Sequence, residues 1–301
     1  MSLSSFTRRN LLACCVCFAA LALTPACAAD FTSDRIEVTT EGEGRDVILI
    51  AGLNSSPRVW REMVRAVPGY RYHLVQVAGF AGRAKGGNTQ GAVAAPVAEE
   101  IARYIAANGL SKPAVIGHSM GGTIGLMLAA RHPGLPSRLM VVDMLPFLGA
   151  MFGPPGTTSG SVKPMADSLL LQMRAADAVA RTARAAATID GMVDTVAMRA
   201  GALDDALNSD ADVTARAYHE LVVTDLTPEL GRISVPTTVL YVVPKGLNLT
   251  EASMDGWYKG AYAPLKGVTL KRIGASAHFI MWDQPETFQA QVKGFLAHAK
   301  P

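Results

Sequence analysis

The sequence predicts an α/β protein with a doubly wound, mostly parallel sheet and an inserted helical cap. Short apolar runs alternate along the chain with Ala-rich helical stretches, as in parallel strands that are joined by helices on both faces of a sheet. This alternation breaks between residues 144 and 230, where no convincing strand occurs, and then resumes. The interruption indicates helices inserted between two strands of the sheet.

Six short, apolar runs are expected to be strands, and several of them are apolar at nearly every position, as in strands that are buried on both faces. They are residues 46–51, 72–77, 113–118, 138–143, 237–243 and 268–273. Helices are expected over residues 91–109, 119–132 and 285–298. Residues 144–230 are expected to cap the carboxyl ends of the strands, where open α/β sheets bind ligands. The core then consists of two parts, residues 30–143 and 231–301.

Residues 1–29 have the pattern of an export signal. Arg8 and Arg9 precede an apolar run over residues 11–23, and small residues follow it. The paired arginines favour the twin-arginine export route over the general secretory route. We therefore expect a periplasmic or secreted protein, with the export machinery as its partner and no stable insertion into a membrane. A retained membrane anchor and lipidation at Cys27 stay open.

The remainder of the chain has no cysteine, because all four lie in the segment above: Cys14, Cys15, Cys17 and Cys27. A mature chain without them needs no disulfide and has no thiolate nucleophile or cysteine metal site. Removing Arg8 and Arg9 lowers the 28 basic residues to 26, against 25 acidic ones, for a net charge of about +1. This balance gives no reason to expect a nucleic acid as partner.

The motif Gly117-His118-Ser119-Met120-Gly121 ends one predicted strand and opens the next predicted helix. G-x-S-x-G in this strand-to-helix context is a nucleophile elbow. A serine on such a tight turn needs neighbours without side chains, because the backbone is crowded there. The turn exposes the hydroxyl and directs the helix N-terminus at a developing oxyanion. Ser119 is therefore the candidate nucleophile.

With this motif, the chain resembles the α/β-hydrolase family, in particular its serine esterases and lipases, from about residue 45 to the end. The resemblance implies an acyl-enzyme mechanism on a small, apolar ester, with no metal and no organic cofactor. It also implies an oxyanion hole made by the backbone N–H groups of Leu53 and Met120, although Ala51 stands where the family usually has histidine. Serine at the elbow argues against dehalogenases and epoxide hydrolases, whose elbow residue is aspartate.

The resemblance implies that His278 is the general base, because it follows the last predicted strand and precedes the last helix. The other histidines lie elsewhere in the pattern: His73, His118, His132, His219 and His298. Asp283 is expected to start the last helix rather than to take part in catalysis.

The position of the catalytic acid is the open question in this sequence. The loop after the strand at 237–243, where the family usually has the acid, begins Pro244-Lys245-Gly246 and offers no carboxylate. Some family members place the acid after the preceding strand, and Asp143 matches that position. The alternatives are Glu251, Asp255, Asp225 and the absence of any acid.

Two classes of function fit the sequence. The first is a serine hydrolase of carboxylic esters that acts through Ser119, His278 and Asp143; amides, lactones, thioesters and carbon–carbon bonds stay open as substrates of the same groups. The second is an exported protein that binds a ligand on a catalytically impaired hydrolase fold, which the displaced acid and Ala51 suggest. The sequence indicates neither the identity of the substrate nor the oligomeric state.

Overall fold

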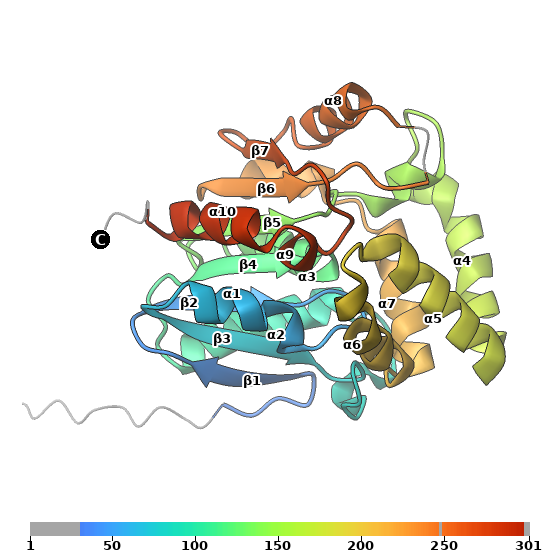
Figure 1. Cartoon of the computed structure of the whole chain (residues 1–301), viewed down its shortest axis with the longest axis horizontal. Helices are drawn as coiled ribbons and strands as arrows, with labels where there is room; N and C mark the ends of the chain where they lie inside the picture. The colour runs from blue at the N-terminus through green and yellow to red at the C-terminus, as the bar shows by residue number, and fades with distance from the viewer. Residues whose placement is uncertain (1–30, 247–248, 298–301) are drawn as a thin grey trace, which may run out of the picture.

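Seven strands form the sheet of the computed structural model, which describes residues 31–246 and 249–297 (Figure 1). In chain order, the strands are β1 Ile36–Glu41, β2 Arg45–Ile50, β3 Tyr70–Val77, β4 Ala114–His118, β5 Arg138–Val142, β6 Thr237–Tyr241 and β7 Thr269–Arg272. Their order across the sheet is β1-β3-β2-β4-β5-β6-β7. β1 is antiparallel to β3, and the other neighbouring strands are parallel. The expected export signal at 1–29 and His298 lie outside the described residues.

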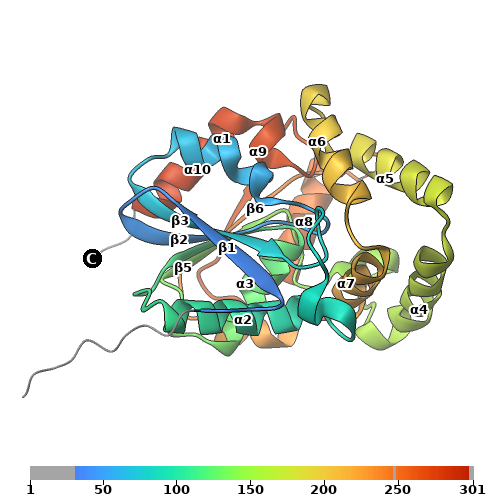
Figure 2. The same cartoon turned by 90° about the horizontal axis from the view of Figure 1, so that it is seen from below.

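Helices cover both faces of the sheet (Figure 2). One face packs on α2 Ala94–Ala107, α3 Met120–Arg131 and α8 Glu251–Ala261; the other packs on α1 Arg61–Ala66, α9 Ile280–Asp283 and α10 Pro285–Ala297. Successive residues of β2 alternate between these two cores: Ile48 and Ile50 enter the first, and Val47 and Leu49 the second. Because both faces are buried, the strand is apolar throughout. The predicted fold class is confirmed.

The six predicted strands and three predicted helices are all present, with ends that coincide or differ by up to three residues. Among the strands, only β1 has no counterpart in the prediction. It lies at the edge of the sheet, and Ile36 is its one fully buried residue. An edge strand with so little apolar surface gives almost no hydrophobic signal.

Four helices lie between β5 and β6, at the end of the sheet toward which the parallel strands point (Figure 1). They are α4 Ser159–Ala175, α5 Ala178–Met192, α6 Val196–Leu207 and α7 Ala211–Val223. Short 3₁₀ helices occur at η1 Pro57–Trp60, η2 Gly86–Thr89, η3 Leu148–Phe152 and η4 Thr227–Arg232. No helix in the described part of the chain combines the length and the apolar character needed to cross a membrane.

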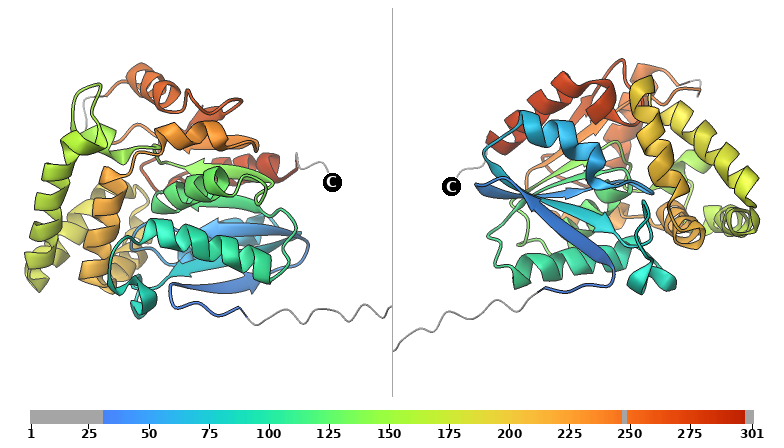
Figure 3. Two further views of the ribbon diagram at one scale, coloured as in Figure 1. Left: turned by 180° about the vertical axis from the view of Figure 1, so that it is seen from behind. Right: turned by 60° about the horizontal axis from the view of Figure 1, so that its bottom comes forward.

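These four helices, here called the cap, form two pairs. α4 packs against α7, and the two helices lie side by side in the left panel of Figure 3. α5 packs against α6. Ile189 is the only residue of α5 that is fully buried. Because little apolar area of α5 is buried, polar contacts with the core are important for holding its pair in place.

The α4–α7 pair is fastened to the core by Glu220 of α7. Its carboxylate accepts the N–H groups of Val93, Ala94 and Ala95 at 2.6, 2.7 and 2.9 Å. These are the first donors of α2, a helix without a side-chain cap at its own N-terminal residue. A carboxylate at this place pairs helix donors that would otherwise lack acceptors and interacts favourably with the helix dipole.

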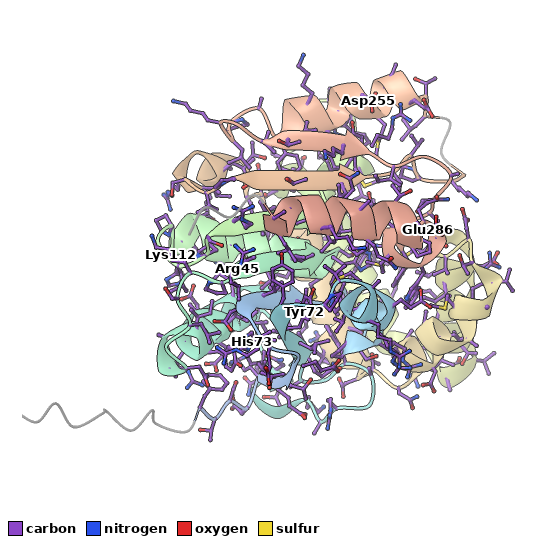
Figure 4. All side chains as sticks on the ribbon, turned by 60° about the vertical axis from the view of Figure 1, so that its left-hand side comes forward. Arg45, Tyr72, His73, Lys112, Asp255 and Glu286 are labelled. Carbon is purple, nitrogen blue, oxygen red and sulfur yellow. The ribbon has the colours of Figure 1, made fainter. Side chains whose placement is uncertain are left out.

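We predict that Glu220→Gln lowers the free energy of unfolding by about 1–3 kcal/mol, because the amide NH₂ faces N–H donors in a buried place. Glu220 is only 7% exposed. Denaturant unfolding measures the change as a lower midpoint at an unchanged slope. Glu286→Gln is the matched control, since Glu286 is an exposed residue in the first turn of α10 (Figure 4). Equal stability of the two variants would contradict the capping role of Glu220.

Candidate active site

Ser119 lies on a tight turn between β4 and α3, with φ 54° and ψ −122°. Positive φ is rare for residues other than glycine and marks a strained position. A β-carbon on Gly117 would lie 2.1 Å from the carbonyl oxygen of Gly121, and one on Gly121 would lie 2.1 Å from that of Ile50. Both glycines of the motif are therefore sterically required, as the crowding argument predicts.

The segment after β2 passes directly beside Ser119. A β-carbon on Gly52 would lie 3.1 Å from the Ser119 Cβ atom. Leu53 follows Gly52 in the chain, and Met120 is the first residue of α3, where N–H groups have no acceptor within the helix. The two residues expected to form the oxyanion hole thus adjoin Ser119 from different segments. Ala51 packs in the core, where it is 5% exposed.

The imidazole of His278 is hydrogen-bonded to the carboxylate of Asp143. Its Nδ1–H donates to the Asp143 Oδ2 atom at 2.6 Å, and the two side chains are 19% and 10% exposed. With the proton on Nδ1, the Nε2 atom of a neutral imidazole is free to accept another proton. The structure therefore joins the expected base to the expected acid.

His118, the residue before Ser119, links the elbow to His278. The His118 Nε2–H donates to the carbonyl oxygen of His278 at 3.1 Å, and the centroids of the two rings lie 4.6 Å apart. The nucleophile elbow and the expected base are thus neighbours, although His118 and His278 are 160 positions apart in the sequence.

Asp143 is held across two strands. It follows β5 directly, has φ 53°, and its own N–H donates to the carbonyl oxygen of Leu240 at 2.7 Å. Its Oδ1 atom accepts the N–H of Val242 at 3.1 Å and the hydroxyl of Tyr258 at 3.3 Å. Aspartate tolerates the left-handed backbone region better than most residues do. These bonds leave Oδ2 directed at His278.

Two tyrosines that the sequence did not point to lie beside Asp143: Tyr258 of α8 and Tyr262, the residue that follows this helix. Burial, and then the nearby charge of Asp143, hold the pKa of Tyr258 well above its ordinary value of 10, so its hydroxyl keeps the proton that it donates. Tyr262 donates to the carbonyl oxygen of Met144 at 2.7 Å. The signal that could have revealed them is the i, i+4 spacing of Tyr258 and Tyr262 on one face of a helix.

The alternative acids have other partners. Glu251 and Asp255 of α8 form ion pairs with Arg272 at 2.7 and 2.9 Å, and Asp255 lies at the upper edge of the view in Figure 4. Asp225 accepts the N–H of Thr227 at the start of η4, at 2.8 Å. None of these contacts is with His278, whose carboxylate partner among the described residues is Asp143.

The remaining described histidines also have partners outside this site. His73 contacts Asp46 and Tyr104, His132 contacts Glu99, and His219 contacts Asp167. The expectation that Asp283 starts the last helix is wrong: it is the last residue of α9, and α10 begins at Pro285. In the described part of the chain, no group of three or more His, Cys, Asp or Glu side chains is placed to hold a metal ion.

Comparison with known proteins agrees with the fold described above. A family model described as the alpha/beta hydrolase fold matches residues 47–218. A protein of Yersinia enterocolitica named as a carbamate hydrolase, RutD, is 32% identical over 105 residues, which are 35% of this chain and 37% of that protein. A pimeloyl-acyl-carrier-protein methyl ester esterase of Aliivibrio salmonicida is 30% identical over 131 residues, 43% of this chain and 48% of that protein. These alignments span less than half of either relative.

Among solved structures, an esterase from Exiguobacterium antarcticum superimposes with a TM-score of 0.72. The superposition covers 87% of this chain and 95% of the esterase, at 19% sequence identity. At this level of identity, the likeness shows the shared fold alone.

We predict that His118 makes the stability of the protein fall as the pH falls. Burial, and then the neighbouring His278, hold the pKa of His118 well below its ordinary value of 6.5. A second proton, on Nδ1, would have no acceptor among the described residues. Below about pH 6.5 the unfolded chain binds a proton that the folded protein does not, so folding loses up to about 1.4 kcal/mol per pH unit at this group.

The test compares His118→Gln with the unaltered protein, because glutamine keeps an N–H donor and does not titrate. Unfolding free energies from about pH 7 to about pH 5 should fall less steeply for the variant. Identical slopes would mean that His118 takes up a proton as readily in the folded protein as in the unfolded chain.

Proposed function

The chain belongs to the alpha/beta hydrolase fold family, and from this premise we propose that it is a serine hydrolase that cleaves carboxylic esters through Ser119, His278 and Asp143. The observation that carries the proposal is the 2.6 Å hydrogen bond from the His278 Nδ1–H to Asp143, beside the strained elbow that holds Ser119. A base that is oriented by a carboxylate and lies beside a serine is the arrangement that activates the hydroxyl as a nucleophile.

In the proposed reaction, the Ser119 Oγ atom attacks the carbonyl carbon of the ester while its proton moves to the His278 Nε2 atom. The N–H groups of Leu53 and Met120 stabilise the oxyanion. His278 then gives this proton to the alkoxide oxygen as its bond to the carbonyl carbon breaks, so an alcohol departs and the acyl group stays bonded to the Ser119 Oγ atom. Water attacks this acyl-enzyme with His278 as base, and the carboxylic acid is released.

Asp143 has two tasks in this scheme. Its carboxylate accepts the Nδ1–H of His278 and so selects the tautomer in which Nε2 is basic. It also stabilises the imidazolium that forms when Ser119 is deprotonated. The alternative of an impaired binding protein rests on the missing acid in the 243–246 loop and on Ala51, and the pairing of His278 with Asp143 supports the hydrolase on the first of these points.

Esters are the proposed substrates, small and apolar, bound between the carboxyl ends of the strands and the cap. One relative is named as a methyl ester esterase, which supports an ester substrate, and another is named as a carbamate hydrolase. Matched amide, lactone and thioester substrates in the same assay test the other bonds that this group of residues can cleave.

We predict that Asp143→Ala lowers kcat for p-nitrophenyl esters by about 10³- to 10⁴-fold, because the imidazole loses its orientation and its counter-charge. Glu251→Ala and Asp255→Ala are the matched controls, since each also removes a carboxylate next to β6 or β7 but leaves His278 untouched. A fluorophosphonate probe followed by peptide mapping should label Ser119.

Near-wild-type kcat in Asp143→Ala, with a folded variant, would overturn the assignment of the acid. An unaltered protein that hydrolyses none of the acyl-ester substrates from acetate to palmitate and does not react with the probe would instead favour the binding protein.

We also propose that the protein is exported through Arg8 and Arg9 to the periplasm or beyond. Replacing both by lysine should keep the full-length precursor in the cytoplasm, because the charge is kept while the twin-arginine signal is lost. Fractionation and N-terminal sequencing of the mature protein provide the measurement. Unchanged export of the double variant would favour the general secretory route.

A further inference from the structure

The carboxylate of Asp283 joins two segments that are far apart in the sequence. Its Oδ2 atom accepts the N–H of Ala277, the residue before His278, at 3.0 Å. Its Oδ1 atom accepts the N–H groups of Asp194 and Thr195, in the turn between α5 and α6, at 3.0 and 2.8 Å. Hydrogen bonds to an ionised acceptor are about twice as strong as bonds between neutral groups.

The residue that follows His278 is attached to the same turn. The N–H of Phe279 donates to the carbonyl oxygen of Met192 at 3.2 Å. Both residues that flank His278 in the chain therefore have their N–H groups bonded to the α5–α6 turn, one directly and one through Asp283. These bonds fix the backbone from which the imidazole projects.

Apolar packing supports the same junction. Val193 follows Met192 in the chain and precedes the two residues whose N–H groups donate to Asp283. It is fully buried, and it belongs to the core cluster that contains Phe279 and Trp282. The Thr195 hydroxyl donates to the carbonyl oxygen of Trp282 at 3.1 Å. The turn is thus inserted into the core beside the base, and not merely laid over it.

The α5–α6 pair also reaches the other side of the site. Asp205 of α6 accepts the N–H and the hydroxyl of Ser56, in the loop that contains Leu53, at 3.0 and 2.6 Å. Asp205 is 3% exposed and is paired with Arg58 at 3.1 Å. One helix pair therefore contacts the loop of the base at one end and the loop of the expected oxyanion hole at the other. The α4–α7 pair is fastened to α2, and the Thr214 hydroxyl of α7 also donates to the Asn54 Oδ1 atom, in the loop that contains Leu53, at 2.6 Å.

We propose that Asp283 is a positioning residue for His278. Because its carboxylate bonds to both segments, the alignment of the imidazole depends on the docking of the α5–α6 turn. The inference rests on the proposed function where it concerns catalysis, and on geometry alone where it concerns the His278–Asp143 bond. Any displacement of the turn moves Ala277 and Phe279, and with them the imidazole. Misplacement of a catalytic group by about 1 Å can lower a rate by about 100-fold.

The experiment compares Asp283→Asn, Thr195→Pro and the matched control Asp225→Asn. Asp283→Asn replaces one acceptor oxygen by a donor group. Thr195→Pro removes the two donors of Thr195 on the cap side, the N–H to Asp283 and the hydroxyl to Trp282, and fits the observed φ of −73° at Thr195. Asp225 accepts a single backbone N–H at η4, away from both segments.

Two readouts are measured for each variant after a check of its fold by circular dichroism and thermal unfolding. The first is kcat and KM on p-nitrophenyl butyrate. The second is the far-downfield proton NMR resonance of the His278 Nδ1–H, which reports the bond to Asp143 without any turnover. We expect Asp283→Asn and Thr195→Pro to lower kcat by about 10- to 100-fold with little change in KM. Both should weaken or abolish the resonance, while Asp225→Asn should behave as wild type.

Wild-type kcat and an unaltered resonance in both Asp283→Asn and Thr195→Pro would overturn the proposal. If Asp283→Asn lowers kcat and weakens the resonance but Thr195→Pro does neither, Asp283 positions His278 only through the loop around Ala277. That result would overturn the proposal that the alignment of His278 depends on the docking of the α5–α6 turn. A protein without ester hydrolysis whose resonance is still lost in both variants would contradict the proposed function and support the positioning role.

Discussion

The geometry of the candidate active site depends on the crowding of the backbone around Ser119. The turn at φ 54° has room only because Gly117 and Gly121 lack side chains, and Gly52 allows the neighbouring segment to pass within contact of the serine. β4, which leads into the turn, has β2 on one side and β5 on the other. Because parallel strands end at the same edge of a sheet, the loops after β2 and β5 converge on the serine and bring Leu53 and Asp143 to it. The central place of β4 thus decides which residues can join the site.

The same neighbourhood explains how Asp143, the proposed acid, can reach His278 from the end of β5. β5 and β6 are adjacent, and adjacent strands lie only about 4.8 Å apart. Asp143 uses its own N–H and one carboxylate oxygen to bond to the backbone of Leu240 and Val242, so it occupies the space at the end of β6 from the end of β5. The buried hydroxyl of Tyr258 satisfies the same oxygen. With Asp143 as the proposed acid, the carboxylate comes from the end of β5 and not from the end of β6, and its bond to His278 is 2.6 Å long.

Each helix pair of the cap is held by one carboxylate that accepts three backbone N–H groups. Glu220 does this for the α4–α7 pair at α2, and Asp283 does it for the α5–α6 turn at the loop of His278. α5 buries little apolar surface, so directional bonds fix its position where the hydrophobic effect alone would not. The two anchors differ in what they touch: the first ends on a structural helix and the second on the loop of the proposed base.

By itself, the sequence determined the fold class, the elbow serine and the place of His278, because each is written in local patterns. Apolar runs identify the buried strands, G-x-S-x-G between a strand and a helix identifies the turn, and only His278 stands between the last strand and the last helix. The sequence could order the candidate acids but could not choose among Asp143, Glu251 and Asp255, because side-chain partners depend on which strands are neighbours. Only the tertiary structure gave Arg272 to the latter two and His278 to Asp143. The long-range contacts of Tyr258 and Asp283 were equally invisible, because packing and not local sequence decides which distant segments meet. Asp283 is 89 positions from Asp194 and 88 from Thr195, and Tyr258 is 115 positions from Asp143.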